Sequence, residues 1–382
     1  MSTPSAFADV RARAAPARYT LAIPDDARRD LATGWLWLAL ASLVGSGLFA
    51  MLLVAARAPW LKDLLPAADF FPVALVVHVD LSVLVWFTAI GGLLWTLNGT
   101  GRWMGLGWTG LAVAAGGSFV MCAAPFLRDA VPVMSNYVPV LDGRLFLFGL
   151  ALFAAGACLL VLRSMIAAPR VGTRPDGRDA LRFGLNSALV SAAMALIAFG
   201  WSYAKLPLPL DSKAYFEVLF WGGGHVLQFT WTLLMFVAWL WLAEASGAPA
   251  PLSPRVAILL FAVGLVSVFS TPVIYLAYDI VSVEHYRLQT WLMRIGGGLA
   301  IFPFMLAILY ALVTAPAAGF PSRPLRAALG WSVALFGAGG LIGLAIQGSN
   351  VRIPAHYHGA IVGVTLAFMG IAYHLLPRLG RR

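Results

Sequence analysis

Ten long apolar runs limit what this chain can fold into more than any other feature. About 20 helical residues are needed to cross about 30 Å of hydrocarbon. Runs of roughly that length or longer lie at residues 32–56, 72–97, 104–126, 145–168, 183–203, 215–243, 255–278, 288–314, 325–347 and 354–377. Continuous apolar runs of this length cross a bilayer as helices, because a helix satisfies its own backbone hydrogen bonds. The sequence therefore predicts an all-α, polytopic transmembrane bundle of about ten helices over residues 32–382. A polar cytoplasmic tail is predicted over residues 1–31.

The overall composition excludes a soluble protein. Of the 382 residues, 61% are hydrophobic and only 11% are charged, whereas soluble globular domains carry roughly 25% charged residues. The net charge of +10 is spread over short loops between the apolar runs and does not form a basic stripe with interleaved aromatic residues. We therefore expect a lipid bilayer, and no nucleic acid, as the partner of this surface.

The distribution of basic residues predicts the topology. If the N-terminus is cytoplasmic, the inner segments carry sixteen Lys and Arg residues and the outer segments carry eight. An excess of positive charge in cytoplasmic loops is the usual bias of membrane proteins. An even number of spans then returns the C-terminus to the cytoplasm as well.

Histidines gather towards the predicted outer side. Five of the six lie there, delivered by four separate spans: His78, His225, His285, His356 and His358. Ionisable side chains inside a membrane are costly and usually functional, and neutral imidazole is a common ligand of metals and heme. The sixth histidine, His374, lies at the inner end of the last span, where we expect it to be solvated and to have no chemical role.

The spacing of His356 and His358 indicates two cofactors. Two positions along a helix separate these side chains by roughly 200°, so they cannot bind one ion without breaking the helix. His78 is then available as a partner of His358 on one heme. On the other side, His225 and His285 are candidates for a further metal opposite a heme bound to His356.

Three motifs resemble subunit I of the heme-copper oxidase superfamily, which includes cytochrome c oxidases and nitric oxide reductases. Val77-His78-Val79-Asp80 resembles the second-helix motif of that family. Phe220-Trp221-Gly222-Gly223-Gly224-His225 resembles its sixth-helix motif. Ala355-His356-Tyr357-His358-Gly359 resembles its tenth-helix histidine pair.

The resemblance implies roles for these histidines. His78 and His358 would bind a low-spin heme, His356 would bind a high-spin heme, and His225 would hold the active-site metal. It also implies a bacterial inner-membrane location and partner membrane subunits in place of the two helices that usually follow the tenth.

Two positions depart from the family pattern. Glu284-His285 stands where the family usually has two histidines, and Phe229 stands four residues after His225, where many oxygen reductases have tyrosine and some nitric oxide reductases have glutamate. The resulting ligand set, His225, His285 and Glu284, favours non-heme iron modestly, while copper stays open.

We therefore expect a respiratory reductase core with a low-spin heme, a high-spin heme and a non-heme metal. Electrons would come from cytochrome c or quinol, and the substrate would be nitric oxide or oxygen. The sequence has no CxxCH motif, so the two hemes would be non-covalent, b-type or related. The alternative is a non-catalytic membrane subunit with a bis-histidine heme, acting in electron transfer or gas sensing.

Overall fold

The computed structural model describes residues 18–61, 65, 69–127, 130–348 and 350–380. Residues 1–17 of the predicted polar tail lie outside this part. The tail was predicted to reach residue 31, but the first helix already begins at Ala27, where the Asp26 side chain accepts a hydrogen bond from the Arg28 backbone N–H. Such a cap satisfies one of the free N–H groups of a helix start.

The prediction of an all-α membrane bundle is confirmed. Within the described residues, ten helical segments are long and apolar enough to span a bilayer. Seven are single helices: α1 (Ala27–Ala55), α4 (Met104–Leu127), α5 (Arg144–Ala167), α6 (Gly177–Lys205), α7 (Ser212–Ala245), α12 (Ser322–Leu344) and α13 (Arg352–Leu375), the last followed by a short turn, η6 (Pro377–Leu379). Their bounds agree with the predicted spans to within several residues.

Three spans change helix type along their length. The second consists of α2 (Phe70–Val79), the π-helix η3 (Asp80–Val85) and α3 (Trp86–Asn98). The seventh consists of α8 (Pro254–Val266), the 3₁₀ turn η4 (Ser267–Phe269) and α9 (Ser270–Ala277). The eighth consists of α10 (Val283–Trp291), the π-helix η5 (Leu292–Gly296) and α11 (Gly297–Thr314). π-Helical turns are rare and frequently lie at functional sites.

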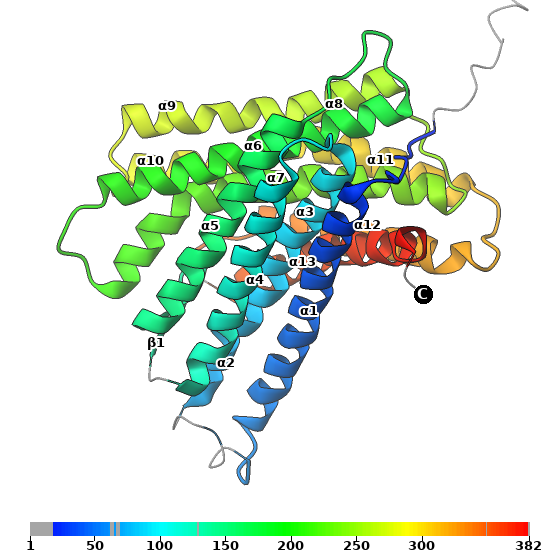
Figure 1. Cartoon of the computed structure of the whole chain (residues 1–382). Coiled ribbons are helices and arrows are strands. Elements are labelled where there is room, and N and C mark those ends of the chain that lie inside the picture. Colours follow the sequence, from blue (N-terminus) through cyan, green and yellow to red (C-terminus); the bar gives the residue numbers. More distant parts are fainter. Residues whose placement is uncertain (1–17, 62–64, 66–68, 128–129, 349, 381–382) are drawn as a thin grey trace, which may run out of the picture.

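A two-stranded hairpin joins α4 to α5. Strand β1 (Val131–Val133) pairs antiparallel with β2 (Val140–Asp142), with Val133 opposite Val140. This hairpin lies at the end of the bundle where α2, α5, α7, α10 and α13 begin, which we call the histidine end (Figure 1).

Glycines allow neighbouring helices to approach closely. α4 packs along α5, α6 along α7 and α12 along α13. A Cβ atom at Gly117 of α4 would lie 2.6 Å from the carbonyl oxygen of Gly149 in α5, and one at Gly339 of α12 would lie 2.5 Å from the backbone nitrogen of Ala360 in α13. Small residues at helix contacts are typical of membrane bundles, where packing drives association.

Leucine at Gly117 is expected to destabilise the bundle by about 1–3 kcal/mol, because the side chain has to displace the backbone of α5. The matched control is Gly116→Leu, since a Cβ atom at this adjacent position meets nothing within 4 Å. Thermal unfolding of the two variants in the same detergent measures the difference. Equal midpoints would show that the α4–α5 contact is looser than described.

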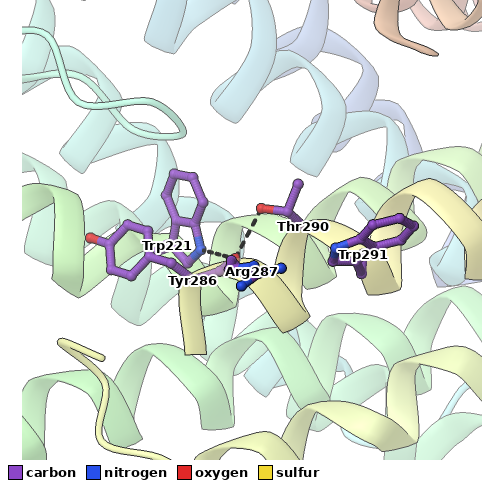
Figure 2. Close-up of a pocket in the computed structure, with 5 residues that line it drawn as sticks. All are labelled: Trp221, Tyr286, Arg287, Thr290 and Trp291. Carbon is purple, nitrogen blue, oxygen red and sulfur yellow. Dashed lines mark hydrogen bonds between the residues drawn. The ribbon is translucent and has the colours of Figure 1, made fainter. Parts of the chain in front are cut away.

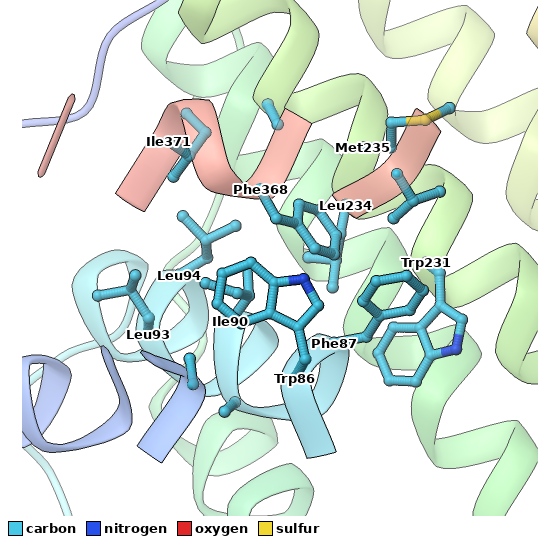
Figure 3. Packing of buried hydrophobic residues seen from close by; sticks show 14 of the residues in the cluster. Trp86, Phe87, Ile90, Leu93, Leu94, Trp231, Leu234, Met235, Phe368 and Ile371 are labelled. Carbon is cyan, nitrogen blue, oxygen red and sulfur yellow. The ribbon is translucent and has the colours of Figure 1, made fainter. Parts of the chain in front are cut away.

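An aromatic cluster ties three spans together at the centre of the bundle. Phe87 of α3 packs edge-on against Trp231 of α7 and Phe368 of α13, with ring centroids 5.6 and 5.3 Å apart (Figure 3). Such edge-to-face pairs are a favoured aromatic geometry. α7 is the most buried of the ten spans, so its side chains lie at the core of the molecule.

Candidate functional site

Three histidines lie on the same side of the central aromatic cluster. The spans that carry Phe87, Trp231 and Phe368 all start at the histidine end. Counting back towards that end, His78 precedes Phe87 by nine residues, His225 precedes Trp231 by six and His358 precedes Phe368 by ten. At 1.5 Å per residue these steps correspond to about 14, 9 and 15 Å along each helix. Measured along their own helices, the three histidines therefore lie about 9–15 Å from the cluster, towards the histidine end.

His78 is held by the first helix. Its Nδ1 lies 2.9 Å from the carbonyl oxygen of Ser46 and 3.0 Å from the Ser46 hydroxyl. A carbonyl oxygen only accepts, so Nδ1 is the donor in the bond to Ser46. Its Nε2 forms no hydrogen bond with a described residue, which leaves that lone pair available. The following residues form the π-helix η3.

Both histidines of α13 have the same proton arrangement but face different ways. His358 is exposed, and its Nδ1 donates to the carbonyl of Pro354 at 2.7 Å. His356 donates from Nδ1 to the carbonyl of Gly339 at 2.7 Å, and its ring lies against Gly343. The Nδ1 edge of the His356 ring therefore lies against α12.

His225 differs because both of its ring nitrogens are engaged. Nδ1 donates to the carbonyl of Trp221 at 2.8 Å, so Nε2 accepts, and the hydroxyl of Tyr137 lies 2.8 Å from it. His225 is 1% exposed. The Tyr137 ring packs directly on Gly224, where a Cβ atom would collide with it.

Tyr137 is held in place by the β1–β2 hairpin. The Glu217 carboxylate of α7 accepts hydrogen bonds from the backbone N–H and the side-chain amide of Asn136. Ser212 donates to Asp142 at 2.6 Å. Burial, followed by smaller effects of Tyr357 and Glu217, raises the pKa of Tyr137 well above its usual value, so the phenol keeps the proton that it donates.

The glycines before His225 each receive an aromatic side chain. A Cβ atom would meet Tyr275 at Gly222, Phe199 at Gly223 and Tyr137 at Gly224. Three rings from three elements can therefore close on α7 just before His225. Sequence reasoning missed this role of Tyr137, because the tyrosine is 88 residues away from His225 and its motif resembles an ordinary loop.

His285 lies in the first turn of α10, after the seventh span. Ser282 caps α10 by accepting from the His285 backbone N–H. The imidazole is 1% exposed and packs edge-on against Tyr275, with centroids 4.7 Å apart. Tyr275 in turn shares a 2.7 Å hydrogen bond with Ser202. Because Tyr275 also lies on Gly222, it connects His285 to the helix of His225.

Glu284 does not join this pair. Its side chain is exposed, and no three His, Cys, Asp or Glu side chains in the described part of the chain are grouped so that they could hold a metal. The structure therefore brings His225 and His285 into one neighbourhood without assembling the predicted three-ligand set.

A small pocket opens beside this neighbourhood. It has a volume of about 290 Å³ and is lined by Trp221, Tyr286, Arg287, Thr290 and Trp291 (Figure 2). Trp221 stacks on Tyr286 with centroids 4.4 Å apart and contacts His225 at 4.8 Å. The Trp221 Nε1–H and the Thr290 hydroxyl both donate to the Tyr286 carbonyl, at 3.4 and 2.9 Å. The indole N–H of Trp221 and the hydroxyl of Thr290 are therefore already hydrogen-bonded.

Two further residues differ from or extend the sequence analysis. His374 was expected to be solvated, but it is only 8% exposed and packs against Trp241. Asp80, two residues after His78, is 1% exposed, and neither carboxyl oxygen has a hydrogen-bond partner among the residues that the structure describes.

Comparison with known proteins gives relatives without a stated activity. No protein-family model matches the chain. It is 26% identical over 406 residues to the "Uncharacterized protein RP382" of Rickettsia prowazekii (strain Madrid E), covering 91% of this chain and 78% of that protein. It is 29% identical over 350 residues to an "Uncharacterized protein" of Aquifex aeolicus (strain VF5), covering 91% of this chain and 84% of that protein. The similarity extends over nearly the whole bundle. Because neither relative has a stated activity, the histidines are the basis for a functional proposal.

Proposed function

We propose that this chain is the core of a membrane respiratory reductase that binds two non-covalent hemes near its histidine end and reduces nitric oxide or oxygen. The observation that carries the proposal is the shared proton arrangement of His78, His356 and His358. Each donates Nδ1–H to a backbone carbonyl. This bond fixes the ring and leaves Nε2 as a lone pair, the arrangement typical of metal-ligating histidine.

The three histidines fit heme. In the proposal, His78 and His358 hold a low-spin heme and His356 holds a high-spin heme. A low-spin heme supplies electron transfer, and a high-spin heme supplies an open position for a gas. The protein's part is to orient each imidazole through Ser46, Pro354 and Gly339, whose carbonyls select the Nδ1–H tautomer.

The residues proposed for a non-heme iron or copper fit less well. Both ring nitrogens of His225 are engaged, by Trp221 and Tyr137, and Glu284 is exposed. We therefore derive no chemical step at a third metal. A metal at His225 requires the phenol of Tyr137 to move away first.

This disagreement favours a second candidate function. A bis-histidine heme at His78 and His358 needs neither His225 nor a third metal. The chain would then be a non-catalytic electron-transfer or gas-sensing membrane subunit.

The proposal includes the partners and the location. Cytochrome c or quinol supplies the electrons, further membrane subunits complete the assembly, and the chain lies in a bacterial inner membrane with both termini in the cytoplasm. The excess of basic residues in the segments at the end opposite the histidine end supports this orientation.

Optical spectroscopy tests the two candidates against each other. We would purify the chain with co-expressed partners, record reduced-minus-oxidised spectra with and without carbon monoxide, and measure heme iron, non-heme iron and copper. Two hemes, one of which binds carbon monoxide, are the expected result for the reductase. One heme that does not bind carbon monoxide would leave the electron-transfer subunit, and absence of heme would rule out both candidates.

A further inference from the structure

Three polar side chains between α9 and α10 lack partners although they are buried. Thr271, His285 and Gln289 are 2%, 1% and 0% exposed. The Thr271 hydroxyl, the Nδ1 of His285 and both amide atoms of Gln289 have no hydrogen-bond partner among the described residues. Buried polar groups in proteins are nearly always hydrogen-bonded, so four such atoms in one place need an explanation.

The register of the two helices places these side chains together. α9 and α10 are consecutive and antiparallel, joined by residues 278–282. Tyr275 contacts His285 at the loop end of this helix pair. Further from the loop, a Cβ atom at Gly296 would lie 2.5 Å from the Ser267 hydroxyl. Thr271 is one turn before Tyr275 on α9, and Gln289 is one turn after His285 on α10. In this antiparallel register Thr271 lies opposite Gln289, between the Tyr275–His285 contact and the Ser267–Gly296 contact.

Gln289 also shares a helix face with His285. The two residues are four apart on α10, and side chains at this spacing are neighbours on the helix surface. A Gln side chain has one acceptor oxygen and an NH₂ donor. It can therefore accept from an imidazole on one side and donate to a hydroxyl on the other.

We infer that Gln289 is the positioning residue of His285, held in turn by Thr271. His285 donates its Nδ1–H to the amide oxygen of Gln289, and Gln289 donates its amide N–H to the Thr271 hydroxyl. Two hydrogen bonds then satisfy all four unpartnered atoms, and no additional molecule is required in this tightly packed region.

This assignment gives His285 the same proton arrangement as the other four histidines of the histidine end. His78, His225, His356 and His358 each donate Nδ1–H to a backbone carbonyl. Only the acceptor differs at His285, where the side-chain amide oxygen of Gln289 takes the place of a backbone carbonyl. In both cases Nε2 keeps the lone pair. The consequence for ligand binding at His285 rests on the proposed function, whereas the hydrogen bonds themselves do not.

Nitrogen-15 NMR of the six histidines tests the inference without any cofactor. The full chain, labelled only in its imidazole nitrogens and embedded in lipid, is measured at neutral pH, and His285→Ala identifies the His285 signals. We expect a neutral ring with a protonated Nδ1 in the unaltered chain. Gln289→Met, which keeps the length of the side chain and removes both polar atoms, is expected to give a mixture of the two tautomers.

Matched variants separate positioning from folding. Gln289→Glu keeps an acceptor for His285 and is expected to restore the Nδ1–H tautomer, while Thr271→Val is expected to shift His285 less than Gln289→Met does. The signals of the other histidines stay unchanged and report an intact fold. Two results would overturn the inference: a His285 ring that is protonated on Nε2 in the unaltered chain, or a His285 tautomer that does not change in Gln289→Met. Because the measurement needs no heme, its outcome is independent of the proposed function.

Discussion

Replacing His78 with alanine is expected to remove the low-spin heme and to leave the carbon-monoxide-reactive heme in place. The variant loses the imidazole whose ring is fixed on α1 by Ser46. Loss of an orienting partner alone weakens metal affinity about 10- to 100-fold, so loss of the ligand itself should weaken heme binding at that site at least tenfold. The pyridine hemochrome assay measures the total heme, and reduced-minus-oxidised spectra with and without carbon monoxide distinguish the two hemes.

The two proposed axial ligands should behave alike. His358→Ala is expected to remove the same heme as His78→Ala, because both histidines lie at similar heights above the aromatic cluster of Phe87 and Phe368. The matched control is His374→Phe, at the other end of α13, where an aromatic ring can still pack against Trp241. If His78→Ala and His358→Ala removed different hemes, the bis-histidine pairing would be wrong.

The sequence was sufficient to predict the spans because hydropathy and span length follow directly from the thickness of the bilayer. It did not predict the π-helices at Asp80–Val85 and Leu292–Gly296. These depend on how each span packs against its neighbours, and a hydrophobic run has no periodicity that distinguishes them. It also placed the start of the first helix late, because Ala27–Leu31 is polar although Asp26 caps it.

For the candidate site, the sequence placed five histidines towards one end of the bundle but did not show what each side chain touches. The position of each histidine along its span follows from counting residues. The contact between Tyr137 and His225 depends on a hairpin that packs back onto α7 through Asn136. No local sequence pattern predicts this packing. The exposure of Glu284 likewise follows from the point at which α10 begins, because Ser282 caps that helix and sets the direction of the next side chains.

The hydroxyl of Tyr137 occupies the ring nitrogen of His225 that the proposed metal would need. Nδ1 of His225 is fixed as a donor by the carbonyl of Trp221, so its one lone pair is on Nε2 and is taken by the phenol. Removing the hydroxyl while keeping the ring on Gly224 should free that lone pair without disturbing the packing of α7.

Tyr137→Phe is therefore expected to increase the affinity of the chain for a divalent transition metal about five- to tenfold. A buried hydrogen bond between neutral groups is worth about 1 kcal/mol, and that cost no longer opposes metal binding. Equilibrium dialysis with radioactive zinc measures the change in the purified, lipid-embedded chain.

The control is Tyr278→Phe, at an exposed tyrosine of the same end, which should leave the zinc affinity unchanged. His225→Ala added to Tyr137→Phe should abolish the gain, because the liberated nitrogen is then absent. A decrease in zinc affinity in Tyr137→Phe would instead mean that the phenol supports the metal site, and His225 would then have to be treated as a ligand assisted by Tyr137.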